Sequence, residues 1–239
     1  MTKNHWISIR QRAGPLVKEV RYQRPTLSKG DLPSVRREKN EIIRSIWNLP
    51  FRRTPEDRLE LMLALFGFEG MSYRLSFNAM STPGSFQDVR RVWRNFLNAM
   101  KRHLKRSFDY VYVIEGRHGD HRYHIHLVVR YSDFTPDDMT LLWPGGEVYH
   151  VPLLLSPDDT YLRTARYFTK ERTDGVVLPI GCRTWVASRS LYKKLPPPEK
   201  TMVTSGDIQI EKKYKVLKQE SKANPFGEYR YAVSMLKRF

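Results

Sequence analysis

Alternation of apolar and polar residues predicts an antiparallel sheet in the middle of the chain. The alternation begins in "MSYRLSFNAM" (71–80) and returns in "FDYVYVIE" (108–115) and "YHIHLVVRY" (123–131). A fourth run, "EVYHVPL" (147–153), is also typical of a strand. Short runs with a period of two residues predict half-buried strands.

A period of 3.6 residues predicts a long helix between the first two of these strands. Ser85 and Asp88 have the spacing of a capping box, so the helix is expected to cover residues 85–106. Its apolar residues form one stripe: Val89, Val92, Trp93, Phe96, Met100 and Leu104.

Two shorter helices are marked by their first turns. One is predicted to begin at "TPDDM" (135–139), and another at "SPDD", with Ser156 as N-cap, Pro157 at the first helical position and Asp159 at the third. The order is then strand, helix, strand, strand, helix, strand, helix. It predicts an α+β fold of the ferredoxin-like or RRM-like kind, an antiparallel sheet covered by helices, with a less regular α+β fold as the alternative.

The chain before this domain, residues 1–66, is expected to be a basic and partly helical N-terminal extension. Helices are predicted at 37–47 and 55–67. The residues before them are interpreted as a flexible arm that carries Lys3, Arg10, Arg12, Lys18, Arg21 and Arg24.

A second extension is expected after the domain, which would span residues 67–195. The triplet "PPP" (196–198) is a stiff break. Residues 196–239 are interpreted as a basic C-terminal appendage with a weak strand at 207–217.

The formal net charge of +17 over 239 residues points to a polyanionic partner, nucleic acid first. A solubilising surface or a structural packing role is the alternative. The single cysteine, Cys182, excludes an internal disulfide and a cysteine-based zinc site. We see no signal peptide and no apolar stretch of membrane-spanning length, so we expect a soluble, intracellular protein.

The two central strands can be placed in register from the turn between them. Gly119 and Asp120 form a two-residue loop, and glycine in the first position favours a type II′ turn. Paired residue numbers then sum to 239, so Glu115 lies opposite His124, and His126 follows two residues further along. Because side chains alternate, these three share one face, and the opposite face is apolar: Tyr110, Tyr112, Ile114, Ile125, Leu127 and Val129.

Two imidazoles and one carboxylate on one face form a possible metal site. Such a three-ligand set leaves coordination positions open for water or substrate. Two alternatives stay open. The histidines can lie on a solvated face while Glu115 pairs with Arg117 or Arg122, or a different cluster can use His118 and His121 in the turn.

The segment "YLRTARYFTKER" (161–172) predicts a helix with two different faces. Arg163, Tyr167 and Lys170 fall on one stripe, and the opposite stripe is expected to pack against the domain: Tyr161, Ala165 and Phe168. A tyrosine beside cations can act as a nucleophile toward a phosphodiester, with a metal ion on the phosphate oxygens. An ordinary surface aromatic is the alternative for Tyr167.

Together these motifs resemble the HUH endonucleases, in particular the rolling-circle replication initiator (Rep) proteins of plasmids and phages. The resemblance covers residues 71–172 in three pieces, found in the family's order. "YRLSFN" (73–78) is similar to the first motif, "YHIHLVV" to the His-hydrophobe-His motif, and "YFTKE" (167–171) to the Tyr-x-x-Lys motif.

The resemblance implies a role for each matching residue. His124 and His126 would be metal ligands, Glu115 the acidic third ligand, Tyr167 the nucleophile and Lys170 its cationic helper. It further implies a divalent metal, Mg²⁺ or Mn²⁺, and nicking and rejoining of one DNA strand through a 5′-phosphotyrosine intermediate at a replication origin. The gap between Glu115 and the histidines is longer than is usual in the family.

The sequence also departs from other branches of the family. Tyr161 is off-register for a second nucleophile, so a one-tyrosine enzyme is predicted. No "GxxxxGK[ST]" phosphate loop is present, so strand separation would need a separate helicase, and extension a separate polymerase. The expected setting is the cytoplasm of a bacterial host cell, in association with the nucleoid, and the expected substrate is single-stranded DNA or an origin hairpin.

Three basic surfaces are candidates for DNA contact. They are the N-terminal arginines, one face of the long helix, and the segment 183–194. On the long helix the cations are Arg90, Arg91, Arg94, Lys101, Arg102, Lys105 and Arg106. Near the substrate we expect Arg163, Arg183, Arg189 and Lys193, with Trp185 stacking on unpaired bases.

Two alternative functions stay open. A transposase or a conjugative relaxase of the same superfamily would use the same chemistry. A non-catalytic binding domain for single-stranded nucleic acid would instead stack bases on Tyr110 and Tyr112 of the sheet.

Overall fold

The computed structural model forms two compact units of α+β structure. Unit 1 consists of residues 1–57 and 195–239, and unit 2 is the continuous segment Arg58–Lys194. The structure describes residues 6–23, 30, 32–48, 54–116, 123–155, 159–170, 183–224 and 227–237.

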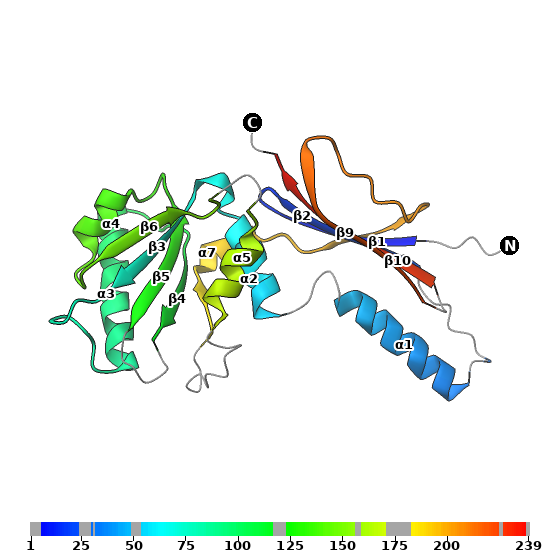
Figure 1. Cartoon of the computed structure of the whole chain (residues 1–239), viewed down its shortest axis with the longest axis horizontal. Helices are drawn as coiled ribbons and strands as arrows, with labels where there is room; N and C mark the ends of the chain where they lie inside the picture. The colour runs from blue at the N-terminus through cyan, green and yellow to red at the C-terminus, as the bar shows by residue number, and fades with distance from the viewer. Residues whose placement is uncertain are drawn as a thin grey trace. The chain divides into compact units, whose positions relative to one another are not determined.

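Unit 2 is built on a five-stranded antiparallel sheet (Figure 1). The order of its strands is β6-β3-β5-β4-β7, so the histidine-bearing strand β5 is central. The predicted α+β class and the predicted order of elements are confirmed from β3 to α5. The bounds are β3 Gly70–Ser76, α3 Phe86–Leu104, β4 Val111–Glu115, β5 His124–Arg130, α4 Pro136–Leu142, β6 Val148–Pro152, α5 Tyr161–Phe168, β7 Val186–Ala187 and α7 Arg189–Lys194.

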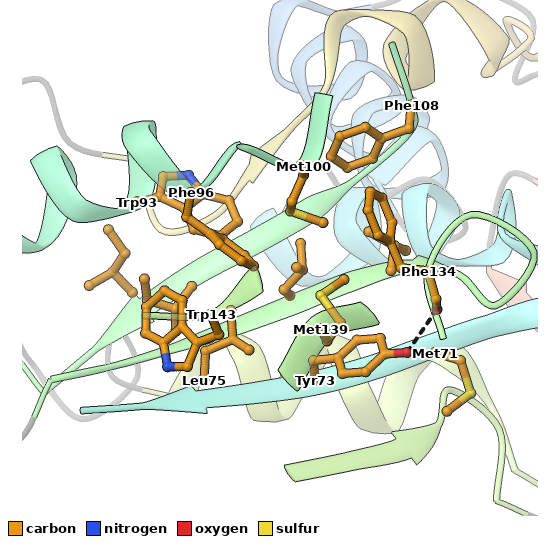
Figure 2. Packing of buried hydrophobic residues seen from close by; sticks show 14 of the residues in the cluster. Met71, Tyr73, Leu75, Trp93, Phe96, Met100, Phe108, Phe134, Met139 and Trp143 are labelled. Carbon is orange, nitrogen blue, oxygen red and sulfur yellow. Dashed lines mark hydrogen bonds between the residues drawn. The ribbon is translucent and has the colours of Figure 1, made fainter. Parts of the chain in front are cut away.

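The helices α3 and α4 cover one face of this sheet and enclose an aromatic core (Figures 1 and 2). As predicted, Ser85 caps α3 by accepting from the Asp88 N–H, and the capping box of Thr135 and Asp138 starts α4. The ring of Phe96 lies between those of Trp93 and Trp143, with centroids 5.7 and 5.0 Å away. The predicted apolar face of β4 and β5 lies in this core.

The opposite face of the sheet carries α5, which begins later than predicted. Its first residue is Tyr161 and its N-cap is Thr160, so Asp159 precedes the helix instead of lying in its first turn. The Asp159 carboxylate accepts from the Leu155 N–H and from Arg163, which fixes it outside the helix. The predicted cap Ser156 and Pro157 lie outside the described residues.

Unit 1 contradicts the prediction of a flexible arm and a separate appendage. The arm forms a hairpin of β1 (Trp6–Ala13) and β2 (Leu16–Gln23), which carries Arg10, Arg12, Lys18 and Arg21 on its strands. Residues from the other end of the chain complete the sheet, whose order is β8-β1-β2-β10-β9. Figure 1 shows the first strands in blue beside the last strand in red. The strands from the C-terminal part are β8 Glu199–Val203, β9 Tyr214–Asn224 and β10 Gly227–Leu236.

Two further helices lie before the sheet of unit 2 in sequence. They are α1 (Pro33–Asn48) and α2 (Pro55–Ala64), which match the two helices predicted there and differ in their bounds. A short 3-10 helix, Gly67–Glu69, leads from α2 into β3. Among the described residues, no helix is long and apolar enough to cross a membrane.

The aromatic core gives a test of the fold. We expect Phe96→Ala to lower the free energy of unfolding by about 3–5 kcal/mol, because it removes a fully buried ring and leaves a cavity. Urea unfolding followed by circular dichroism measures this change. Leu141→Ala, at a side chain that is 78% exposed on α4, should stay within about 0.5 kcal/mol of the unchanged protein. Equal effects in the two variants would contradict this packing.

Candidate metal centre and tyrosine site

The register of the central hairpin is the one predicted from its turn. Glu115 pairs with His124, and Val113 pairs with His126. Gly116, which follows the strand directly, has φ of 96°, a conformation that glycine adopts without strain. Alternation along β4 and β5 therefore brings Glu115, His124 and His126 to the face opposite the aromatic core.

Both imidazoles approach the same carboxylate oxygen, Glu115 Oε2. The Nε2 atom of His124 lies 2.9 Å from it, and Nε2 of His126 lies 3.2 Å from it. The Nζ atom of Lys170 is 3.1 Å from this oxygen. Glu115 is thus paired with groups of the site, and the predicted alternatives Arg117, Arg122, His118 and His121 lie outside the described residues.

Burial makes this cluster electrostatically unusual. Glu115 is only 2% exposed and His126 only 4%. Burial by itself would raise the pKa of Glu115, but the nearby His124, His126 and Lys170 outweigh it and hold that pKa well below the usual range. For His126, burial is the largest effect and lowers its pKa, although Glu115 opposes the shift. The carboxylate is therefore ionised and the buried imidazole is favoured in its neutral form.

These protonation states and distances suit a divalent metal ion. The three ligand atoms lie within 4.8 Å of one another, and two ligands bound at right angles about 2.1 Å from one ion are about 3 Å apart. Glu115 Oε1 is buried and has no hydrogen-bond partner among the described residues, and the buried His126 Nε2, although 3.2 Å from Glu115 Oε2, is not aligned for a hydrogen bond to it. A coordinated ion would satisfy such buried polar atoms, so the donor set fits a metal.

Helix α5 brings Tyr167 to the same place. Its neighbour Phe168 is 2% exposed and packs against His126, with ring centroids 5.1 Å apart. Tyr167 is 45% exposed, and its ring centroid lies 5.2 Å from that of His126. Tyr161 is fully buried and donates a hydrogen bond to the Gly67 carbonyl, as expected for a core residue.

Lys170 links the tyrosine to the carboxylate. Its Nζ atom lies 4.1 Å from the centroid of the Tyr167 ring. The hydroxyl of Thr169, which is buried, donates to the Ala165 carbonyl and fixes the chain where α5 ends. Burial alone would lower the pKa of Lys170, but Glu115 and Tyr167 raise it, so the side chain is a stable cation.

A cavity of about 370 Å³ opens beside this site. Both His126 and Tyr167 line it, and the predicted DNA contact Arg163 lies on its rim, paired with Asp159 at 3.0 Å. Two further residues of its wall were not found from the sequence. They are Arg74 and Tyr149, whose side chains form a cation–π contact of 5.5 Å.

The signal for Arg74 was present but incomplete. Arg74 pairs with His126 across β3 and β5, and with Tyr149 across β3 and β6. Residues that pair directly share a face, so all three point the same way. The alternation of polar and apolar residues in each strand could be recognised in the sequence, but the sequence did not show which strands pair with one another.

The remaining predicted DNA contacts separate into two groups. Arg183, Arg189 and Lys193 are exposed. Trp185 is only 7% exposed and its ring stacks on that of Tyr192, with centroids 6.1 Å apart. The ring of Trp185 is thus part of the packing around α7, and its stacking on an unpaired base stays a prediction.

No protein-family model, curated protein or solved structure matches this chain.

Metal binding can be tested on the full-length chain by titration calorimetry with Mn²⁺ as the probe. We expect Glu115→Gln and His126→Ala each to weaken Mn²⁺ binding at least about tenfold, because each removes one of three ligands. His150→Ala is the matched control, since this histidine is exposed on β6 and lies outside the cluster. An unchanged affinity in both ligand variants, or an equal loss in His150→Ala, would rule out this site.

Proposed function

We propose that this chain is a metal-dependent endonuclease that nicks and rejoins one strand of DNA through a 5′-phosphotyrosine intermediate. The observation that carries the proposal is the convergence of Tyr167 and Lys170 on the Glu115–His124–His126 cluster. The Tyr167 ring packs against His126, and Lys170 contacts both the carboxylate and the tyrosine ring.

The arrangement of unit 2 supports a ferredoxin-like fold of the HUH type. The elements from β3 to β6 follow the order βαββαβ, and their strands are arranged β6-β3-β5-β4. The histidine pair lies on the central strand and the tyrosine on the helix that follows β6. These positions agree with the motif order on which the resemblance to Rep proteins rests.

The chemistry assigns a separate task to each group. A divalent ion held by Glu115, His124 and His126 would polarise a non-bridging oxygen of the scissile phosphate. The Tyr167 oxygen attacks phosphorus, the P–O3′ bond breaks, the phenolic proton is lost and the 3′ oxygen takes up a proton. The products are a 5′-phosphotyrosine and a free 3′-hydroxyl, and rejoining reverses the same steps.

The charges of the site favour this reaction. Lys170 is held as a cation by Glu115, and it lies beside the tyrosine ring where negative charge develops during attack. The cavity next to Tyr167 carries Arg74 and Arg163, which can hold the phosphates of the substrate strand. We propose Mg²⁺ or Mn²⁺ as the ion, because availability selects between the metals that such a site accepts.

In biological terms we propose initiation of rolling-circle replication of a plasmid or phage. The substrate would be single-stranded DNA or an origin hairpin, with a separate helicase and polymerase, in the cytoplasm of a bacterial host. An HUH transposase or relaxase would use the same residues and differ in the DNA that it recognises.

A non-catalytic binder that stacks bases on an open sheet is the less favoured function. Helices α3 and α4 cover this face and Tyr110 and Tyr112 are partly buried against the core beneath α3, so the sheet does not offer an open platform. The two rings reach the surface at a groove beside α3.

The nucleophile is tested by covalent capture of DNA. The protein is incubated with single-stranded oligonucleotides that cover its own origin and with Mn²⁺, and adducts that survive boiling in detergent are separated by electrophoresis. We expect Tyr167→Phe to form no adduct, because only the phenolic oxygen is removed. Tyr161→Phe should still form it, since that hydroxyl is buried against Gly67. An adduct in Tyr167→Phe would refute the assignment.

The role of Lys170 is tested by cleavage rates at saturating oligonucleotide. We expect Lys170→Ala to lower the rate about 10²-fold, because it removes a cation beside the attacking oxygen, and Lys170→Arg to recover part of it. Arg166→Ala, an exposed cation on α5 outside the site, is the control and should cleave at nearly the unchanged rate. Equal rates for Lys170→Ala and Arg166→Ala would contradict a catalytic role.

A further inference from the structure

A groove of about 500 Å³ lies on the other side of the sheet of unit 2, between α3 and the strand β4. Side chains of both elements line it, together with Val186 of β7. The proposed catalytic face does not use it. Its wall combines cations, amides and aromatic rings: Gln87, Arg90, Trp93, Arg94, Asn98, Lys101, Tyr110 and Tyr112.

The groove is positively charged, and none of the described residues that line it is acidic. Arg90, Arg94 and Lys101 are exposed and lie on one stripe of α3, in a row about 16 Å long. Arg91 of the same helix, by contrast, pairs with Asp88 at 2.8 Å. Within the described part of the chain, no carboxylate pairs with the three groove cations. They are therefore available to an anionic ligand.

The aromatic side of the groove is continuous. The ring of Trp93 lies 4.5 Å from that of Tyr112, and the Tyr110 and Tyr112 rings are 6.1 Å apart. Both tyrosines are only half-buried. Figure 2 shows Trp93 at the edge of the core, beside α3. Its indole N–H is buried and has no hydrogen-bond partner among the described residues, so the wall contains an unsatisfied donor.

We propose that this groove is a second binding site for single-stranded nucleic acid, separate from the catalytic face. Cations in a row hold a sugar–phosphate backbone, and the accessible parts of the half-buried Tyr110 and Tyr112 rings stack on an unpaired base. In a duplex the base faces are already stacked on one another, so the rings select a single strand. The volume suits about one nucleotide at the aromatic wall, with the backbone continuing along α3.

The site does not depend on the proposed nicking activity, so it is tested in the Tyr167→Phe background. A fluorescein-labelled oligo(dT) is titrated with the full-length chain, and fluorescence anisotropy is measured at several salt concentrations. We expect Arg90→Ala/Arg94→Ala to weaken binding at least about tenfold. We also expect the slope of log K against log salt to become shallower by about 1.4, the value for two lost phosphate contacts on a single strand.

The matched control is Arg102→Ala/Lys105→Ala, which removes the same charge from the last turn of α3 and its C-cap, outside the groove. Its affinity should stay within about twofold. An equal loss in both double variants would show a general charge effect and overturn the groove as a site.

Photo-crosslinking with an oligonucleotide that contains 5-iodouracil locates the base. We expect adducts on the peptide that carries Tyr110 and Tyr112. Adducts confined to the cavity of Tyr149 and Arg163 overturn the proposal. A competition experiment gives a second test: if poly-glutamate at equal charge displaces the DNA, an acidic peptide is the better ligand and the proposal is overturned. Failure of the unchanged protein to form a phosphotyrosine adduct refutes the nicking activity and leaves these results in force.

Discussion

The candidate site depends on one buried carboxylate oxygen, Oε2 of Glu115. Two imidazoles and an ammonium group approach it from a second strand and from the segment that follows α5. An isolated carboxylate that is 2% exposed would be strongly disfavoured in its charged form, so this cluster of partners is what permits burial. The same partners hold the pKa of Glu115 below its usual range.

Helix α5 and strand β5 position the site residues through buried side chains next to them in sequence. On α5, Phe168 is buried against His126 while the adjacent Tyr167 is exposed, because neighbouring residues on a helix point about 100° apart. Phe168 therefore anchors α5, and the adjacent Tyr167 is left exposed. On β5, Ile125 packs in the aromatic core between two histidines that point the other way. The aromatic core thus fixes the geometry of the opposite face.

The sequence was sufficient where local periodicity decides the structure. The two-residue turn expected from the sequence predicted the register that β4 and β5 have, and the stripe of α5 separated Tyr167 from Tyr161. It was insufficient where pairing is non-local: Arg74 and Tyr149 reach the site only because β3 lies between β5 and β6. The burial of Trp185 depends in the same way on a tertiary contact.

The strands of unit 1 were missed for a different reason. In the first half of β2, two apolar residues, Leu16 and Val17, are followed by two polar residues, Lys18 and Glu19, so the alternation is broken there, although both polar side chains are buried. Glu19 accepts from Ser8 across the hairpin and from Arg21 on its own strand, and Lys18 lies 3.9 Å from Asp57, which is far away in sequence. When polar residues of a strand are paired with groups inside the protein, polar and apolar residues need not alternate, and the two-residue period that predicts a strand is weakened.

The sheet of unit 1, assembled from both ends of the chain, has a consequence for synthesis on the ribosome. Unit 2 is continuous from Arg58 to Lys194, so all of its strands are available before the last part of the chain is made. The hairpin of β1 and β2 is made before unit 2 but acquires its neighbours β8 and β10 only after unit 2 has been made. Because domains fold as units while the chain emerges, unit 2 is expected to be structured while the hairpin of β1 and β2 still lacks the rest of its sheet.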